Sequence, residues 1–438
     1  MKSSLHAGRG AICFGLFLGL VRLCGAYSVL THEQVVDLLW KDSIQPLLLA
    51  RFPSATADEL LNAHAYAYGG SLVQDMGYYP FGSKLFSDLT HYVRSGDFVV
   101  SLVRESSDLN EYAFALGALA HYSADICGHP AVNRSVSIEF PKLAKKYGNV
   151  VTYENDPKAH IRTEFGFDIV QVAKNRYTSD RYHDFIGFEM SKTLMERAFV
   201  KTYGIPLTDV MANEDLAIGT FRRAISKVIP EMTRVALVSR KKELVQETPN
   251  FNAKKFRYYL SRSNYQKEWG KGYRKPTFGT RVLAFFLRIV PKIGPFKAVD
   301  FKIPTKQTED LYIASVDSTL DNYKQLLRQA GAKDFQLPDT DFDTGHATVP
   351  GEYALADATY AQLLDKLAQH NFDRVTPELR SNILAFYGDP NATLASKRKP
   401  AAWQKTQDEI QRLKGLPNNG LPNTEKSAAV IPTLSSTR

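Results

Sequence analysis

The chain has 438 residues, of which 44% are hydrophobic and 23% charged, and its formal net charge is +9 at pH 7. This composition is typical of a folded globular protein, so it excludes a largely disordered chain and a protein built mainly of membrane-spanning helices. The length allows two or three domains, although a helical enzyme of this size can form one body with appendages.

The first 26 residues are organised like a secretory signal. Two basic residues precede an apolar run from Ala11 to Val21, and small residues end the segment at Ala26. The apolar run is shorter than the roughly 20 residues that a membrane-spanning helix needs. The sequence therefore predicts a secreted or periplasmic protein that is cleaved near Ala26 and begins at Tyr27.

Cleavage at this point would leave a single cysteine, because Cys13 and Cys24 lie in the removed segment. Cys127 would then have no partner for an intrachain disulfide, and stability is expected to come from packing and bound metal. On a helix, Cys127 points away from the face that carries His121 and Asp125. This placement favours a buried, inert thiol over a metal ligand.

Histidines and acidic residues near the N-terminus have the spacing of metal ligands. His121 and Asp125 lie four residues apart, and so do His160 and Glu164, which places each pair on one face of a helix. Either residue of such a pair, taken alone, is better explained as a core histidine or a capping carboxylate. The full series indicates zinc: Tyr27, with its processed amine and carbonyl, His32, Asp75, His91, His121, Asp125, His129, His160 and Glu164.

The sequence around His129 predicts the end of a helix. Gly128 is a natural helix terminator, and Pro130 disfavours the α conformation at the residue before it. His129 is therefore expected to leave the helix and turn. The same helix is expected to begin near Asp108 with a capping-box arrangement, and its small residues should let neighbouring helices approach closely.

Apolar residues recur at spacings of three and four along much of the chain, whereas alternating strands are scarce. The expected fold class is therefore all-α, with the metal ligands projecting from several helices into one cleft. His64, eleven residues before Asp75, could share its helix face and donate a hydrogen bond to it, or could be a core residue. The expected helices are Ala57 to Gly77, Glu189 to Lys201, Glu214 to Val228, Thr308 to Gln329, Tyr353 to Gln369 and Pro377 to Tyr387.

The ligand series resembles the zinc-dependent phospholipase C family and its relatives, the trinuclear-zinc nucleases that cut single-stranded nucleic acid. The resemblance covers roughly residues 27–203. Three stretches especially match a bacterial branch of the phospholipase C family: Tyr27-Ser-Val-Leu-Thr-His32, Ser87-Asp-Leu-Thr-His91 and Ala120-His-Tyr-Ser-Ala-Asp125. The resemblance implies the multi-helix fold of these families, with three zinc ions in one cleft.

The resemblance also implies a role for each candidate. Asp75 would be the catalytic residue as well as a ligand, because it would orient or deprotonate the attacking water. The three ions would be bound by Asp75, His91, His121 and Asp125, by His129, His160 and Glu164, and by the amine and carbonyl of Tyr27 with His32 and a shared Asp125.

The chain departs from the family pattern at two positions. Better-known members begin with Trp where this chain has Tyr27, which matters little because only backbone atoms would bind metal. They also place a histidine six residues after the helical aspartate, whereas His129 follows Asp125 by four. The shorter spacing resembles glycosylphosphatidylinositol-specific phospholipase D, so it leaves the substrate and the cleaved bond open.

Basic residues are concentrated in Arg240–Lys302, which contains 16 Lys or Arg and 4 Asp or Glu. Within it, Arg281 to Lys297 mixes aromatic side chains with cations, as in a segment that contacts a membrane surface. A buried helix with solvated basic ends explains the same pattern. The membrane interpretation would place the enzyme on anionic lipid.

The expected organisation has five parts. They are a signal peptide (1–26), a zinc-dependent catalytic helical domain (27–239), the basic aromatic segment (240–305), a C-terminal helical region (306–414) and a flexible tail (415–438). His183 and His346 have no partners at ligand spacing, so both are expected to be structural or on the surface.

Three functions remain open from the sequence. The favoured one is a secreted zinc-dependent phosphodiesterase, a phospholipase C that acts on phospholipid headgroups and releases diacylglycerol. The second is a single-strand-specific zinc nuclease, whose nucleic acid partner the basic segment would attract. The third is a non-catalytic zinc-stabilised module, against which the mixed His and carboxylate ligands argue because structural zinc usually prefers thiolates.

Overall fold

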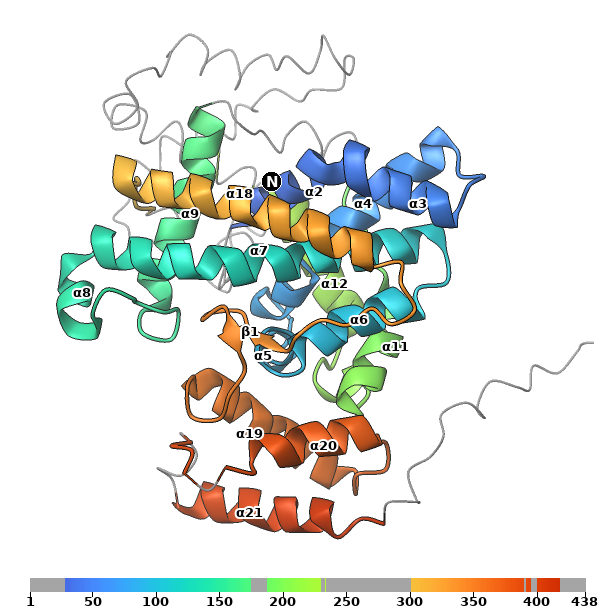
Figure 1. Ribbon diagram of the computed structural model, residues 1–438, viewed down its shortest axis with the longest axis vertical. Helices are drawn as coiled ribbons and strands as arrows, with labels where there is room; N and C mark the ends of the chain where they lie inside the picture. The colour runs from blue at the N-terminus through green and yellow to red at the C-terminus, as the bar shows by residue number, and fades with distance from the viewer. Residues whose placement is uncertain are drawn as a thin grey trace, which may run out of the picture.

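The computed structural model describes residues 28–174, 187–229, 233, 301–389, 391–394 and 400–417. Within these ranges the chain is mostly helical, with almost no strand (Figure 1), which confirms the all-α fold class. No helix of the described residues combines the length and the apolar character needed to cross a bilayer. The signal segment, Tyr27, His183 and the basic segment up to residue 300 lie outside the described residues.

The helices follow one another in two groups, before and after the basic segment. Those before it are α2 (Val29–Leu39), the π-helix η1 (Trp40–Ile44), α3 (Gln45–Arg51), α4 (Ala57–Gly70), the 3-10 helix η2 (Val73–Tyr78), α5 (Lys84–Tyr92), α6 (Ser95–Glu105), α7 (Leu109–Glu139), α8 (Pro141–Tyr147), α9 (Pro157–Ala173), α11 (Lys192–Tyr203), the 3-10 helix η3 (Leu207–Asp209), α12 (Glu214–Arg223) and the π-helix η4 (Ala224–Val228). Those after it are α18 (Lys306–Gln329), α19 (Ala354–Gln369), α20 (Pro377–Phe386) and α21 (Pro400–Lys414). Between α18 and α19, β1 (Thr340–Asp341) and β2 (His346–Ala347) pair antiparallel, with Thr340 opposite Ala347.

The long helix α7 lies at the centre of the arrangement. It begins after Asp108, whose side chain accepts a hydrogen bond from the Glu111 backbone amide at 2.8 Å. It packs against α4 on one side and α18 on another, so that α18 runs alongside it in Figure 1. Helices from both ends of the described chain, from Val29 to Leu413, contribute to one hydrophobic core. The C-terminal helices are therefore packed into the same core as the residues that carry the candidate ligands.

The expectation that His129 leaves the helix is wrong, because α7 continues through Pro130 to Glu139. A proline inside a helix costs about 3 kcal/mol. The turns that follow it bury Val132 and Val136 against α9 and α18, and each buried valine contributes about 1.5–3 kcal/mol. Burial of this face outweighs the cost of the proline, so the helix persists.

Two expected helix boundaries also shift. Helix α4 ends at Gly70 rather than Gly77, and Asp75 lies on the separate 3-10 helix η2. Helix α11 begins at Lys192 rather than Glu189, because the Glu189 amide donates instead to the Ala65 carbonyl at 3.0 Å. The other expected helices agree with the structure to within about two residues.

Small residues allow α4 and α7 to cross closely, as the sequence predicts. A Cβ atom at Gly117 would lie 2.0 Å from the Ala67 carbonyl oxygen, and one at Gly70 would lie 1.9 Å from the Phe114 carbonyl oxygen. Both distances are far below van der Waals contact, so backbone would have to move.

Gly117→Ala should therefore lower the free energy of unfolding by about 3 kcal/mol or more, because it overpacks two backbones. The matched control is Gly219→Ala on α12, where a Cβ atom has nothing within 4 Å. This control should be stabilising by up to about 1 kcal/mol, because alanine favours helix over glycine. Urea unfolding of both variants at saturating zinc measures the difference. Equal effects of the two substitutions would contradict the close crossing.

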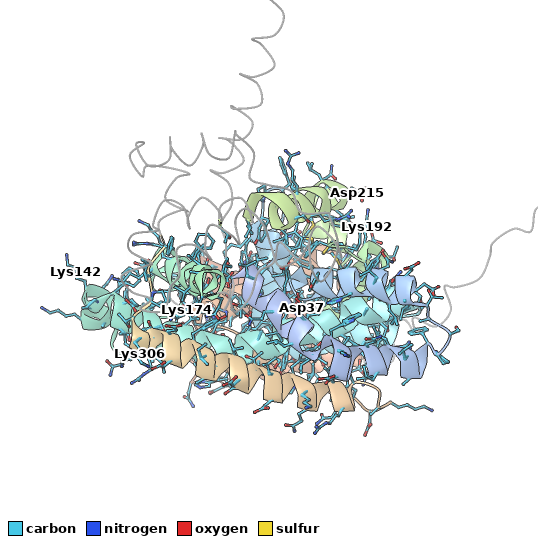
Figure 2. All side chains as sticks on the ribbon, turned by 90° about the horizontal axis from the view of Figure 1, so that it is seen from above. Asp37, Lys142, Lys174, Lys192, Asp215 and Lys306 are labelled. Carbon is cyan, nitrogen blue, oxygen red and sulfur yellow. The ribbon has the colours of Figure 1, made fainter. Side chains whose placement is uncertain are left out.

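Charged side chains cover the outer faces of the helices (Figure 2). Lys174, at the end of α9, binds Glu309 of α18 at 2.6 Å and so ties the two helices together. Lys192 of α11 similarly binds Asp215 of α12 at 2.7 Å. The Lys192–Asp215 pair is exposed, and such pairs contribute little stability individually. The packing of the core, rather than these pairs, holds the helices in place.

Candidate metal centre

The candidate ligands that the structure describes come together from five helical elements, and all are buried. His32 lies on α2, Asp75 on η2 and His91 on α5, while α7 and α9 carry the others. Three groups have ligand atoms within 4.8 Å of one another: His32, His121 and Asp125; Asp75, His91 and His121; and His129, His160 and Glu164. The structure therefore gathers the residues that the sequence proposed, and His121 belongs to two of the groups. Tyr27 lies outside the described residues.

Helix α7 supplies His121, Asp125 and His129, which follow one another at intervals of four residues on one face. Asp125 Oδ2 lies 3.1 Å from His121 Nε2 and 3.6 Å from His129 Nε2. Because α7 stays helical past Pro130, His129 reaches the cluster from the same face as the other two. Its position requires no turn.

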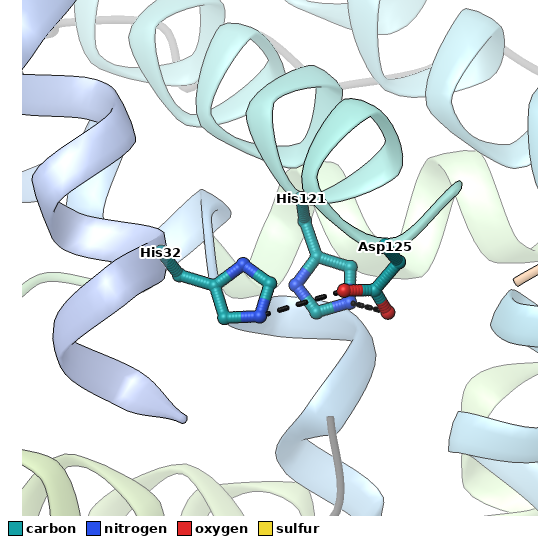
Figure 3. Close-up of side chains that lie close together, drawn as sticks. All are labelled: His32, His121 and Asp125. Carbon is teal, nitrogen blue, oxygen red and sulfur yellow. Dashed lines mark ion pairs between the residues drawn. The ribbon is translucent and has the colours of Figure 1, made fainter. Parts of the chain in front are cut away.

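Asp125 is the central residue of the cluster. Besides its neighbours on α7, its carboxylate faces His32 Nε2 at 3.5 Å and His91 Nε2 at 3.5 Å. Figure 3 shows the carboxylate beside His32 and His121, whose rings are stacked with centroids 4.4 Å apart. One carboxylate thus contacts residues from all three groups, which suits a ligand shared between ions.

Helix α9 supplies His160 and Glu164 and also fixes the helix that carries His32. His160 Nδ1 lies 2.6 Å from Glu164 Oε1. One turn later, Asp168 accepts hydrogen bonds from the Leu30 amide at 3.0 Å and the Thr31 hydroxyl at 2.7 Å. Asp168 thereby holds the start of α2, next to His32. Sequence analysis missed this residue, although its spacing of four from Glu164 was visible.

Hydrogen bonds to carbonyl oxygens orient three of the imidazole rings. The N–H at Nδ1 of His91 donates to the Ser87 carbonyl at 2.7 Å, and that of His121 donates to the Ser71 carbonyl at 2.9 Å. The Nε2 atom of His160 lies 2.8 Å from Asn133 Oδ1. Since a carbonyl oxygen only accepts, the other ring nitrogen of each histidine faces the cluster, where it is placed to bind a metal ion.

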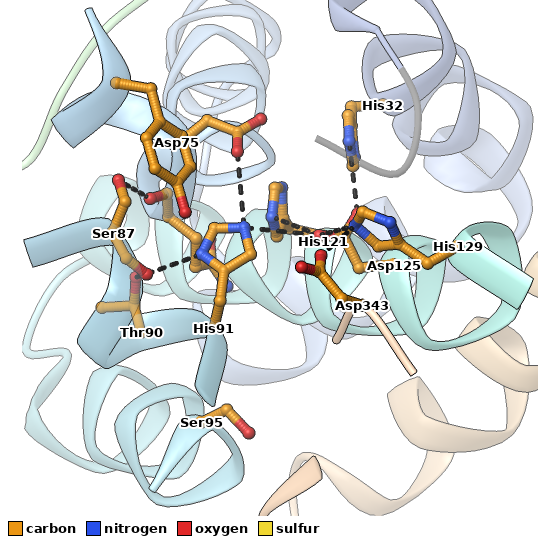
Figure 4. A network of polar contacts seen from close by, with 12 residues as sticks. His32, Asp75, Ser87, Thr90, His91, Ser95, His121, Asp125, His129 and Asp343 are labelled. Atoms are coloured by element: carbon orange, nitrogen blue, oxygen red, sulfur yellow. Dashed lines mark hydrogen bonds and ion pairs between the residues drawn. The ribbon is translucent and has the colours of Figure 1, made fainter. Parts of the chain in front are cut away.

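Ser87 connects the ring of His91 with the position of Asp75. Its hydroxyl accepts from the Gly77 amide at 2.9 Å and donates to the Gln74 carbonyl. These bonds tie η2 to α5, so that Asp75 Oδ1 lies 3.4 Å from His91 Nε2 (Figure 4).

The inward atoms of the cluster fit a divalent cation. Among the described residues, His121 Nε2, His129 Nε2, Glu164 Oε1 and both carboxylate oxygens of Asp125 are buried without a hydrogen bond. A buried polar atom without a partner is costly. Nitrogen and oxygen donors that converge in this way are ligands that zinc accepts, and bonds to zinc would satisfy them.

The pKa values of the histidines describe how the cluster behaves without a cation. Burial disfavours the charged form of His91, but the carboxylates of Asp125 and Asp75 outweigh it and raise its pKa to about 10. Burial is likewise outweighed at His129, where Asp343 and Asp125 raise the pKa to about 9. Burial lowers the pKa of His32 and His160 to about 3. Two of the imidazoles thus hold protons that a metal ion would displace.

The acids of the cluster are affected by the same burial. Burial raises the pKa of Asp75 and of Glu164 above the ordinary carboxyl range. At Asp125 burial acts in the same direction, but the surrounding histidines, His121 first, outweigh it and lower the pKa well below that range. Asp125 is therefore ionised even without metal, in keeping with its central place.

Sequence analysis missed a further acid of the cluster, Asp343. It lies in the turn between β1 and β2, and its Oδ1 is 3.3 Å from His129 Nε2 (Figure 4). The histidine singled out in this stretch, His346, is exposed and lies 3.2 Å from Glu352. The available signal was two acids, Asp341 and Asp343, close to a histidine, but no spacing rule connects them to α7.

Two other residues are placed away from the cluster. His64 is buried, its Nε2 lies 2.9 Å from Asp37 Oδ1 and its ring stacks on Trp40, so of the two alternatives the structure favours the core residue. The Cys127 thiol is half-buried on the α18 side of α7, where burial raises its pKa. A raised pKa keeps this thiol protonated, as expected for an inert cysteine.

Comparison with known proteins adds one match. A comparison with curated proteins and one with solved structures found none. Residues 31–213 match the family described as zinc dependent phospholipase C. This range contains eight of the nine candidate ligands, all except Tyr27, whereas Asp343 lies beyond it. This stretch, which holds the buried cluster of metal-ligand candidates, is therefore the part of the chain that resembles the zinc-dependent phospholipase C family.

Proposed function

We propose that this protein is a secreted phospholipase C that uses zinc to hydrolyse the headgroup phosphoester of phospholipids and releases diacylglycerol. The family supports a zinc-dependent phosphodiesterase of the phospholipase C type. The observation that carries the proposal is the coincidence of the family match with three buried ligand groups around Asp125.

The proposal assigns the candidate ligands to three zinc ions. One ion would be held by the group of Asp75, His91 and His121. A second would be held by the group of His129, His160 and Glu164. His32 would hold a third with the amine and carbonyl of a processed Tyr27. Asp125 would be shared, because its carboxylate faces histidines of every group. Bound zinc would supply a water with a pKa near 7 and positive charge beside the phosphate.

Asp75 is the proposed catalytic residue. Its Oδ1 lies 3.4 Å from His91 Nε2 at the edge of the cluster, and among the described residues this oxygen has no hydrogen bond. Burial raises the pKa of Asp75, so its carboxylate takes up a proton more readily than an exposed one. In this proposal Asp75 orients the attacking water and accepts its proton.

Aromatic side chains beside the cluster suit a lipid substrate. Tyr78 packs against the His91 ring with centroids 5.7 Å apart, and Tyr153 packs against the His160 ring at 5.9 Å. The two tyrosines form one small apolar group with Ile161 and Leu355. Both tyrosines are buried, so in this proposal the half-buried Ile161 and Leu355 supply the apolar surface for a diacylglycerol leaving group.

Export and membrane contact belong to the proposal on sequence grounds. The N-terminal 26 residues resemble a signal peptide, and export would expose the Tyr27 amine. The basic aromatic segment within Arg240–Lys302 would contact anionic lipid. Both regions lie outside the described residues, apart from Phe301 and Lys302.

The proposal is tested by assaying the exported, purified protein on phosphatidylcholine, phosphatidylinositol and single-stranded DNA. We expect diacylglycerol from at least one lipid, loss of that activity with a chelator, and recovery when zinc is added back. Hydrolysis of DNA alone would favour the nuclease alternative. Zinc binding without hydrolysis of any of the three would favour a non-catalytic module.

A further inference from the structure

We infer that Asp343 is an additional ligand of the ion held by His129, His160 and Glu164, and that the C-terminal region supplies it. This inference rests on the proposed zinc centre. Asp343 follows the family-matched residues by more than a hundred positions, so the catalytic helices alone would lack it.

Backbone contacts hold the β1–β2 hairpin against the helices that carry the cluster. The Phe342 amide donates to the His91 carbonyl at 3.2 Å, and the Thr340 amide donates to the Ser95 hydroxyl at 3.0 Å. The Ser95 hydroxyl in turn donates to the Thr340 carbonyl at 2.6 Å. The hairpin is thus fixed to α5 at His91 itself.

The turn of the hairpin fits onto α7 at its proline. Gly345 has a φ of +74°, and a Cβ atom there would lie 2.8 Å from the Ile126 carbonyl oxygen and 3.0 Å from Pro130 Cγ. Pro130 has no N–H to offer the Ile126 carbonyl, so the helix surface differs from that of a regular turn. A glycine lets the hairpin approach this surface, one residue away from His129.

The Asp343 side chain is fixed so that one oxygen faces the cluster. Its Oδ2 accepts hydrogen bonds from the Tyr92 hydroxyl at 2.9 Å and the Tyr353 hydroxyl at 2.5 Å. Its Oδ1 lies 3.3 Å from His129 Nε2, the nitrogen that would bind the ion. The side chain is 1% exposed, so this oxygen is not facing bulk water.

Asn133 links Asp343 to another member of the same group. Its Nδ2 donates to the Asp343 backbone carbonyl at 2.7 Å, and its Oδ1 lies 2.8 Å from His160 Nε2. One amide side chain on α7 therefore sets the position of both the hairpin and the His160 ring. The hairpin and the ligand group are positioned together.

The charges of the surroundings argue for a cation next to Asp343. Asp125, Glu164 and Asp341 are buried carboxyl groups in the same region, and burying several carboxylates together is costly unless protons or a cation neutralise them. Two tyrosine hydroxyls stabilise only one oxygen of Asp343. A zinc ion bound by His129, His160 and Glu164 would stabilise the other.

The neighbouring Asp341 gives a matched control. It is also buried and also lies in the hairpin, but its Oδ1 accepts from the Thr344 amide at 3.0 Å within the turn. Asp343→Asn and Asp341→Asn therefore each replace a buried carboxyl group of the same hairpin by an amide. Only the first removes a ligand under this inference.

The test measures zinc binding by full-length exported protein, stripped with a chelator and titrated with zinc against a chromophoric competitor. We expect Asp343→Asn to weaken the affected zinc site at least tenfold, and Asp341→Asn to change it by less than about threefold. Asp343→Ser is measured in parallel, and circular dichroism of the metal-free proteins shows which variants fold. A folded Asp343 variant with zinc binding within twofold of the unmodified protein would overturn the inference.

Zinc-loaded crystals of the unmodified protein give a test that needs no variant. Anomalous scattering should place an ion bound by His129 at about 2.0–2.2 Å from an Asp343 oxygen, the usual distance for a carboxylate ligand. An ion on His129 well beyond that distance from Asp343 would overturn the inference while leaving the proposed function intact. If the unmodified protein binds no zinc, the proposed function itself fails.

Discussion

Asp125→Asn should remove most of the zinc that the protein binds and abolish its hydrolytic activity. The carboxylate faces four histidines, His32, His91, His121 and His129, at 3.1–3.6 Å. A structural zinc site has an apparent binding free energy of about 10–16 kcal/mol over four ligands, so one ligand accounts for about 3 kcal/mol, or about a hundredfold in affinity. Because Asp125 would serve more than one ion, we expect a loss of at least this size.

The matched control for Asp125→Asn is Glu139→Gln, a second buried carboxylate on α7. Glu139 accepts from the Thr305 amide and the Thr308 hydroxyl, each at 2.7 Å, and so caps α18 far from the cluster. The control should lower stability by about 1 kcal/mol, the contribution of such a cap, and leave the zinc content unchanged. Elemental analysis after dialysis compares the two proteins. Unchanged zinc content in Asp125→Asn would contradict the central role of this residue.

Zinc affinity should rise steeply with pH between pH 6 and pH 8. In the metal-free protein the pKa of His91 is about 10 and that of His129 about 9, so both rings are protonated over this range. Each must lose its proton to bind zinc. Each displaced proton changes affinity about tenfold per pH unit, so the two histidines give about a hundredfold per unit. A proton on Glu164, whose pKa burial raises, adds to this slope.

The sign of this effect follows from the direction of the two pKa shifts. A raised histidine pKa means that the proton competes more strongly with zinc for the ring nitrogen. This competition weakens as pH rises toward 9, so zinc binds more tightly. His32 and His160, whose pKa values are lowered to about 3, are already neutral and add no proton. Titration calorimetry in buffers with different ionisation enthalpies counts the protons released. Release of fewer than one proton per chain at pH 7 would show that these rings are neutral before zinc binds.

Residues of the C-terminal region contact the helices that carry the metal cluster. Tyr92 and Asp343 are hydrogen-bonded although 251 positions separate them, and α19 packs against α5, which carries His91. The matched residues alone therefore omit groups that border the cluster. The hairpin and α19, which supply these groups, lie outside the family-matched residues.

Local spacing alone was enough to predict that the two pairs of candidate ligands lie side by side. His121 with Asp125, and His160 with Glu164, are four residues apart, and one helical turn places such residues on the same face. Their separation depends on backbone geometry, so it does not change with the rest of the fold. The all-α fold class follows from apolar periodicity in the same way.

Only the tertiary structure decided that α7 continues past Pro130 and which distant residues join the cluster. Pro130 predicts a break, but the burial of Val132 and Val136 against other helices outweighs its cost, and that burial depends on partners far along the chain. Asp343 has no local signal, because its place beside His129 comes from the hairpin docking on α5 and α7. The relative positions of residues one turn apart are determined by the helix itself. Contacts between residues hundreds of positions apart are determined by how the helices pack.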